Sequence, residues 1–322
     1  MENYSRVVSS VLGVFLVMGI GALCRRRGWL TREADQSLAR LCANVFLPAY
    51  LASRIIEGPR LESLAVIATP CAFGFAATAA GVLIGRWLAG LAGHLIGLDT
   101  LAKQRAFALC VGVCNYGYIP LPLAEEFFPS AVVDLILHNV GVDLAMWSVG
   151  IAVITGSAGG GWRRAMLSPP LLSVIAAVGL VQTGLDASVP AAIGTAIGAV
   201  GNCAIPMGLI LGGAIIIDFL VESEWSGSQG VVVSAIGIRQ LLMPLLMLLA
   251  TSTLAGGAYR GLELRQVMML EAAMPSAVFP IVLVRLYDQD TQTALKVVLS
   301  TSLAGIVLIP VWLAVGKAWL GL

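Results

Sequence analysis

The sequence predicts an all-α membrane protein of about ten transmembrane helices in two inverted halves. Hydrophobic residues make up 58% of the 322 residues and charged residues only 11%, whereas soluble domains carry about a quarter charged residues. A glycine-rich segment divides the chain near its middle. A short motif of Asn and Pro recurs in both halves, each time at the same distance from a later proline.

Apolar runs between polar, glycine or proline breaks define the predicted spans. A bilayer core about 30 Å thick needs roughly 20 apolar residues per helix. The basic cluster 25–27 follows the first run rather than preceding it, so we interpret that run as a retained helix and not a signal peptide. The predicted spans are 7–24, 36–56, 63–89, 104–124, 130–155, 167–184, 189–219, 232–254, 265–286 and 296–320.

The distribution of Lys and Arg predicts the orientation, since these residues stay on the cytoplasmic side. We predict that the protein lies in the cell (inner) membrane. The side with more Lys and Arg is then the cytoplasmic one, so the 157–166 segment is cytoplasmic and both termini lie on the opposite side. That richer side collects Arg25, Arg26, Arg27, Arg32, Arg86, Lys103, Arg105, Arg163, Arg164, Arg285 and Lys296, against Arg6, Arg54, Arg60, Arg260, Arg265 and Lys317 on the other.

The glycine-rich stretch that begins at Gly156 predicts a linker between two repeats, residues 1–156 and 167–322, with residues 157–166 between them. Five spans on each side are an odd number, so the second repeat must run upside down. Inverted repeats are typical of secondary transporters. A shift of 158 positions places Asn44 on Asn202, Pro48 on Pro206 and Pro122 on Pro280.

Prolines interrupt the predicted fourth and ninth spans. A proline inside a helix frees a carbonyl, which at membrane depth needs a partner or a water-lined cavity. We therefore predict two half-helices in each span, whose N-termini direct amide groups at one point and suit a carboxylate. Simple proline kinks without a ligand are the alternative. The residues concerned are Asn115, Tyr116, Gly117, Pro120 and Pro122 in the fourth span, and Pro275, Ser276 and Pro280 in the ninth.

Few ionisable residues lie within the predicted spans. Asp143 is the one acidic residue that we place well inside a helix of the first half; it either binds substrate or a proton, or it is a structural carboxylate. Arg239, placed at the start of the eighth span, and Glu271, one turn before Pro275, are candidate charge partners or interface residues. We place His94 in a loop, and we interpret the six cysteines as free thiols.

Other classes of function find little support. The net charge of +1 argues against a nucleic-acid partner. No zinc-protease, nucleophile-elbow or phosphate-loop motif occurs, so an enzyme is disfavoured. No metal site or cofactor is predicted.

With these residues in place, the sequence resembles the auxin efflux carrier family, which includes plant PIN carriers and bacterial organic-acid permeases. The fourth-span stretch is similar to the family's N-x-x-x-x-G-x-P signature, with Asn115 and Pro122 at the matching ends. The stretches 202–213, 273–275 and 300–310 also look like family patterns. Pro120 stands where the family has glycine, and Pro280 is an additional proline, so the substrate does not carry over.

The resemblance implies that the broken fourth and ninth helices cross and that substrate binds beside the crossing prolines. It also implies a scaffold of spans one, two, six and seven, which would include Asn44, Pro48, Asn202 and Pro206. The other spans would then form a unit that moves in elevator fashion, and the chain would form a homodimer in the lipid bilayer.

The predicted function is secondary-active transport of a small organic anion, such as a mono- or dicarboxylate. Asn115, Tyr116, Pro122 and Pro275 would shape the site and Asp143 would tune its charge. Two alternatives stay open: a sodium-coupled symporter of the bile-acid type, and a membrane receptor or sensor that binds a ligand without transporting it.

Overall fold

The computed structural model describes residues 2–59, 63–157, 167–222, 229–254 and 261–322, and these residues form helices with no β-strand. The prediction of an all-α membrane protein is confirmed. Most of the predicted linker, from residue 158 onward, lies outside the described residues. Six helical segments are long and apolar enough to cross a membrane: Ser5–Arg26, Ala65–Ile96, Pro129–Thr155, Ala191–Val221, Gln229–Leu254 and Thr291–Leu320.

The first part of the chain, up to the described limit at residue 157, contains a long helix at each hydrophobic run, and three of these runs change helix type or break. The elements are α1 (Glu2–Arg26), α2 (Arg32–Leu41), the π-helical turn η1 (Cys42–Phe46), α3 (Leu47–Glu57), α4 (Leu64–Ile96), α5 (Leu101–Gly112), α6 (Pro120–Phe127), η2 (Pro129–Ala131), α7 (Val132–Ala145), the π-helical turn η3 (Met146–Gly150) and α8 (Ile151–Thr155).

The later part is also helical. Its elements are α10 (Pro169–Thr183), η4 (Leu185–Ser188), α11 (Ala191–Gly201), α12 (Ala204–Glu222), α13 (Gln229–Ile236), the π-helical turn η5 (Gly237–Leu242), α14 (Met243–Leu254), α15 (Gly261–Ala273), α16 (Phe279–Leu286) and α17 (Thr291–Leu320). Each predicted hydrophobic segment overlaps one of these helices or a consecutive run of them.

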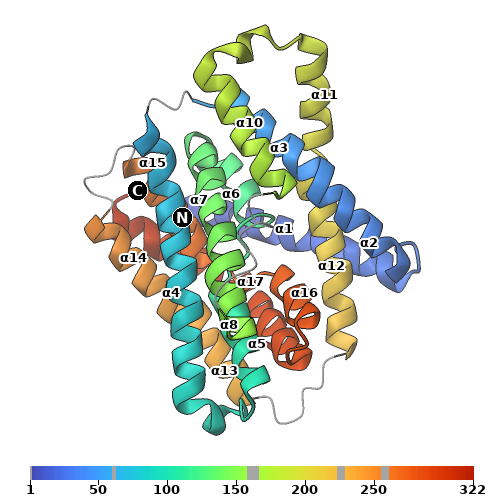
Figure 1. Ribbon diagram of the computed structural model, residues 1–322, viewed down its shortest axis with the longest axis vertical. Helices are drawn as coiled ribbons and strands as arrows, with labels where there is room; N and C mark the ends of the chain where they lie inside the picture. The colour runs from blue at the N-terminus through green and yellow to red at the C-terminus, as the bar shows by residue number, and fades with distance from the viewer. Residues whose placement is uncertain (1, 60–62, 158–166, 223–228, 255–260) are drawn as a thin grey trace.

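The helices pack in two groups (Figure 1). Group 1 consists of α1–α3 and α10–α12: α1 packs along α12, and α3 packs on α10 and α11. Group 2 consists of α4–α8 and α13–α17: α4 packs on α5 and α7, and α17 packs on α5, α13 and α15. In Figure 1, α10, α11, α2 and α12 lie at the top and right, whereas α4, α13 and α14 lie at the left and below.

Glycines allow several of these helices to touch through their backbones. A Cβ atom at Gly213 of α12 would overlap the carbonyl of Met18 in α1, and one at Gly21 of α1 would overlap the carbonyl of Ile210 in α12. Small residues at helix contacts are the usual means of close packing in membranes, because the hydrophobic effect does not drive helices together in lipid. The contact between α1 and α12 therefore depends on the absence of side chains at these positions.

Two details of the sequence-based prediction are wrong. His94 lies in the last turn of α4, which runs seven residues beyond the predicted 89 to a left-handed Gly97 (φ 86°). Arg239 lies within η5 and not at the start of its span, because the helical run begins earlier, at Gln229. Asp134, in the first turn of α7, is a further buried acidic residue of this half, at 1% exposure.

Candidate functional site

The central feature of the molecule is the pair of breaks between α5 and α6 and between α15 and α16. The two broken segments lie side by side in antiparallel orientation, with Cys114 opposite Ser276. The Asn115 amide donates to the Pro275 carbonyl at 2.7 Å, and the Ala277 amide donates to the Val113 carbonyl at 3.0 Å. Each unsatisfied backbone group would cost several kcal/mol in a bilayer. The two breaks therefore satisfy part of each other's backbone, and this joint of residues 113–115 with residues 275–277 is called the crossing below.

Prolines explain where the second half-helices begin. Pro120 occupies the first position of α6, and Pro280 lies in the first turn of α16. The missing N–H of proline costs nothing in a first turn, where its fixed φ angle already suits the helix. Both half-helices thus start at the proline-containing stretches where the sequence predicted interruptions.

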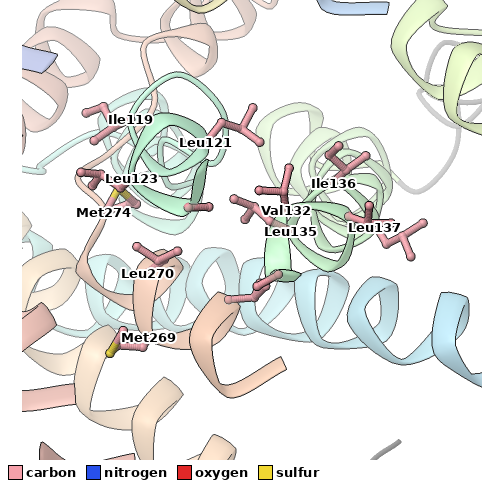
Figure 2. Close-up of a cluster of buried hydrophobic side chains, with 14 of the residues drawn as sticks. Ile119, Leu121, Leu123, Val132, Leu135, Ile136, Leu137, Met269, Leu270 and Met274 are labelled. Carbon is pink, nitrogen blue, oxygen red and sulfur yellow. The ribbon is translucent and has the colours of Figure 1, made fainter. Parts of the chain in front are cut away.

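Apolar side chains from α6, α7 and α15 pack beside the crossing (Figure 2). They are nearly or fully buried and belong to one continuous core cluster, so the crossing is enclosed by a packed hydrophobic core. The side chains labelled in Figure 2 are Ile119, Leu121, Leu123, Val132, Leu135, Ile136, Leu137, Met269, Leu270 and Met274.

On one side of the crossing, residues 115–118 are only partly buried. Within the described part of the chain, the backbone amides of residues 116–119 donate no hydrogen bond and the Asn115 side chain has no partner. A Cβ atom added to Gly117 would meet no atom within 4 Å. This stretch therefore combines open space with free hydrogen-bond donors at the N-terminus of α6, where a helix favours negative charge.

Asp143 faces this stretch from α7. The Tyr116 hydroxyl donates to its Oδ1 at 2.6 Å. The structure thus brings Asp143 into contact with the fourth-span residue Tyr116. An ionisable residue that faces the interior of a membrane protein normally pairs with another polar group, and here that group is the hydroxyl of a tyrosine.

A second polar cluster lies on the buried side of the crossing. The Cys114 thiol donates to Glu271 Oε2 at 3.1 Å, and Arg239 donates to the carbonyls of Met274, at 2.9 Å, and Glu271, at 3.1 Å. The Ser276 amide donates to Thr301 Oγ1 at 3.2 Å, which links the break to α17. Arg239 and Glu271 are therefore brought together, but through the Glu271 backbone rather than through an ion pair.

The four predicted scaffold residues belong to group 1, whose Gly208 on α12 packs closely against the Tyr118 ring. Asn44 is exposed in η1, where its side chain donates to the Arg40 carbonyl at 2.8 Å. Asn202 and Pro206 are exposed at the junction of α11 and α12, and Pro48 lies in the first turn of α3. The η1 turn contacts α11 and α12, so the two copies of the Asn/Pro motif lie near each other in group 1.

A charged cluster that sequence reasoning missed joins the two groups. Glu125 of α6 pairs with Arg54 of α3 at 2.6 Å and accepts from the Tyr50 hydroxyl at 2.7 Å, while the Arg54 guanidinium lies 5.1 Å from the Tyr50 ring centre. A cavity of about 400 Å³ opens beside Arg54 and Glu125. No spacing in the sequence points to this cluster, because Glu125 lies 75 positions after Tyr50.

Comparison with known proteins identifies the family of the chain. Residues 6–162 and 153–313 match the model of a family described as membrane transport protein. The chain belongs to this family. The resemblance to auxin efflux carriers is thereby confirmed, and the chain is a membrane transporter.

A relative of the transporter comes from Methanothermobacter thermautotrophicus (strain ATCC 29096 / DSM 1053 / JCM 10044 / NBRC 100330 / Delta H). It is an uncharacterized transporter, 26% identical over 308 residues, which cover 94% of this chain and 96% of the relative. The similarity thus extends along nearly the whole of both chains. Within the described ranges of the transporter, no group of three or more His, Cys, Asp or Glu residues could hold a metal ion.

Proposed function

We propose that this transporter is a secondary-active carrier of small organic anions, such as mono- or dicarboxylates. The observation that carries the proposal is the partly buried stretch 115–118, with an unpaired Asn115 side chain, free amide donors at residues 116–119 and open space at Gly117. A carboxylate accepts several hydrogen bonds at once and is favoured at a helix N-terminus. Pro120, Pro122, Pro275 and Ser276 shape this site, and Asp143 sets its charge.

The proposal includes ten spans in two inverted five-helix repeats, 1–156 and 167–322. Support comes from the matching positions of the two breaks: α6 begins at Pro120, α16 has Pro280 in its first turn, and the 158-residue shift places Pro122 of α6 on Pro280. In carriers built this way, one half moves against the other around a site near the bilayer midplane. We also propose the inner-membrane location and the orientation with both termini outside the cytoplasm.

The proposed motion is of the elevator type. Group 1 would form the static scaffold, and group 2, which contains the crossing, would carry the substrate. The packing supports this division, because helices contact each other mainly within their own group. In this proposal the contacts between Tyr50, Arg54 and Glu125 are made in one end state and broken in the other.

The first test uses the Asn115 side chain. Purified protein in liposomes should take up labelled mono- or dicarboxylates, and Asn115→Ala should lower that uptake by about tenfold or more, since a hydrogen bond to a charged group contributes about 1.5–3 kcal/mol. The matched control is Asn44→Ala, which removes the same amide from an exposed position in η1, where it bonds only the Arg40 carbonyl of its own helical run. Equal uptake by the Asn115 variant and wild type would show that the site is wrongly placed. Binding without flux in the wild type would favour a receptor.

The second test fills the open space at Gly117. The Gly117→Leu variant should fold normally, because nothing lies within 4 Å of the new Cβ and the backbone is not left-handed there. Uptake should nevertheless drop to background, since the leucine occupies the space where substrate binds. Gly179→Leu on α10, which also adds a side chain into open space, should transport normally. Undiminished uptake by the Gly117 variant would place the substrate elsewhere.

A further inference from the structure

Arg239 is a buried cation whose hydrogen bonds go to backbone carbonyls. Its side chain is 1% exposed and extends from η5 to the break that follows α15. There Nε donates to the Met274 carbonyl and Nη2 donates to the Glu271 carbonyl. Within the described part of the chain, no carboxylate oxygen lies within 4.0 Å of this guanidinium. The guanidinium therefore acts on the end of a helix rather than on an acidic side chain.

The position of Arg239 follows from the way α15 ends. The last carbonyls of a helix have no partner within it, and together they form the negative end of the helix dipole. Helix α15 ends at Ala273 in a fully buried environment, where water does not reach these oxygens. In carriers with broken helices, such carbonyls commonly coordinate a sodium ion. Here a guanidinium covalently attached to η5 occupies that position.

The surroundings of the guanidinium contain further buried oxygen atoms. Glu271 is fully buried, and its Oε1 has no hydrogen-bond partner, while Oε2 accepts from Cys114. Glu271 is also close enough to Arg239 to interact electrostatically. Two carbonyls and a carboxylate are the type of ligand that a hard monovalent cation prefers. The cluster is thus suited to one positive charge, whether attached to the chain or free.

Neighbouring contacts fix the site in place. Gln240, the residue after Arg239, is fully buried; its Nε2 donates to the Thr301 carbonyl at 3.3 Å, and its carbonyl accepts from Trp312 Nε1 at 2.6 Å. Both partners belong to α17. The π-helical turn η5 is therefore anchored independently of the Arg239 side chain. The segment that carries the Glu271 and Met274 carbonyls is held separately, by the Ser276 amide on Thr301 Oγ1 and by the hydrogen bonds between the two breaks, so truncating the Arg239 side chain should leave these carbonyls where they are.

We propose that Arg239 is a tethered cation in the position of a coupling ion, and that removing its guanidinium creates a binding site for a monovalent cation. The carbonyls of Glu271 and Met274 and the carboxylate of Glu271 form this site. The inference depends on these contacts and not on the identity of the substrate. It follows that the wild-type transporter binds its substrate without sodium, because the positive charge is already present.

The test measures thermal unfolding of purified Arg239→Ala in chloride salts of sodium, methylguanidinium and N-methylglucamine at equal ionic strength. Methylguanidinium and sodium should each raise the variant's melting temperature saturably by several degrees, and N-methylglucamine should not, because an ion that binds only the folded state stabilises it. The wild type should show no such difference. The control Arg86→Ala removes a partly buried arginine of α4 that hydrogen-bonds a side chain, Gln104, and should respond to no cation.

Two results would overturn the proposal. One is an Arg239→Ala variant whose melting temperature responds to the three salts in the same way as that of Arg86→Ala. The other is a sodium requirement for ligand binding or uptake by the wild type. If the alanine variant does not fold, the same salts are tested on Arg239→Gln, and the wild-type sodium measurement decides independently. Because the unfolding assay contains no substrate, its outcome is separate from that of the organic-anion proposal.

Discussion

Gly213→Ala is expected to prevent the transporter from folding, whereas Gly212→Ala, one position earlier, leaves it intact. A Cβ at Gly213 would overlap the carbonyl oxygen of Met18, while one at Gly212 would meet nothing within 4 Å. Overpacking a well-packed interior typically costs about 1–3 kcal/mol. Here both sides of the contact are helix backbone, which cannot rotate away as a side chain does. We therefore expect a loss at or above the upper end of that range.

The two glycine variants differ only in the face of α12 that receives the methyl group. Size-exclusion profiles in detergent and melting temperatures should show aggregated or strongly destabilised protein for Gly213→Ala. Gly212→Ala should behave like wild type, because alanine has the higher helix propensity and finds free space. A monodisperse Gly213 variant with an unchanged melting temperature would mean that α1 and α12 do not approach as closely as described.

Reversing the charge of Glu125 should slow transport strongly. Glu125→Lys places a second cation beside Arg54 and removes the acceptor of the Tyr50 hydroxyl, so α3 and α6 repel each other where they now attract. Both side chains of the ion pair are 31% exposed, so solvent weakens the pair without abolishing it. A shift of about 1.4 kcal/mol already changes a conformational equilibrium tenfold. We expect uptake to fall by about that factor as the end state shown here is depopulated.

Two further variants distinguish the effect of losing the ion pair from the effect of adding a positive charge. Glu126→Lys makes the same change at the next, exposed position and should transport normally. Combining Glu125→Lys with Arg54→Glu restores opposite charges and should recover part of the uptake. If Glu125→Lys and Glu126→Lys transport equally well, the contact between α3 and α6 has no part in the transport cycle, and the proposed division into two moving groups loses its support.

Much of the fold could be predicted because hydrophobicity and proline act locally. A run of apolar residues predicts a membrane helix from composition alone, and closely spaced prolines with a nearby glycine favour an interruption, whereas α4 and α17 continue through the single prolines Pro70 and Pro310. The breaks before α6 and α16 were therefore accessible from Pro120 and Pro280. The π-helical turns were not, since η1, η3 and η5 contain ordinary helix-forming residues and their geometry depends on the helices packed against them.

The candidate site was only partly predictable. Asn115, Tyr116 and Gly117 are adjacent in the chain, and a single break brings them together. The contact of Asp143 with Tyr116, by contrast, depends on how α7 packs. The sequence suggested Arg239 and Glu271 as charge partners, but the guanidinium binds the Glu271 carbonyl. Residue identity predicts a charge, whereas only the path of the backbone reveals which oxygen atom faces it.

The way in which the two breaks are joined has a consequence for the evolution of such carriers. Main-chain atoms make the joint, through Asn115 with Pro275 and Val113 with Ala277, and every amino acid other than proline supplies the same donor and acceptor. Side chains beside the joint are consequently free to change without loosening it. A lineage can therefore change the side chains of the proposed pocket by point mutation while the hydrogen bonds that join the two segments are kept.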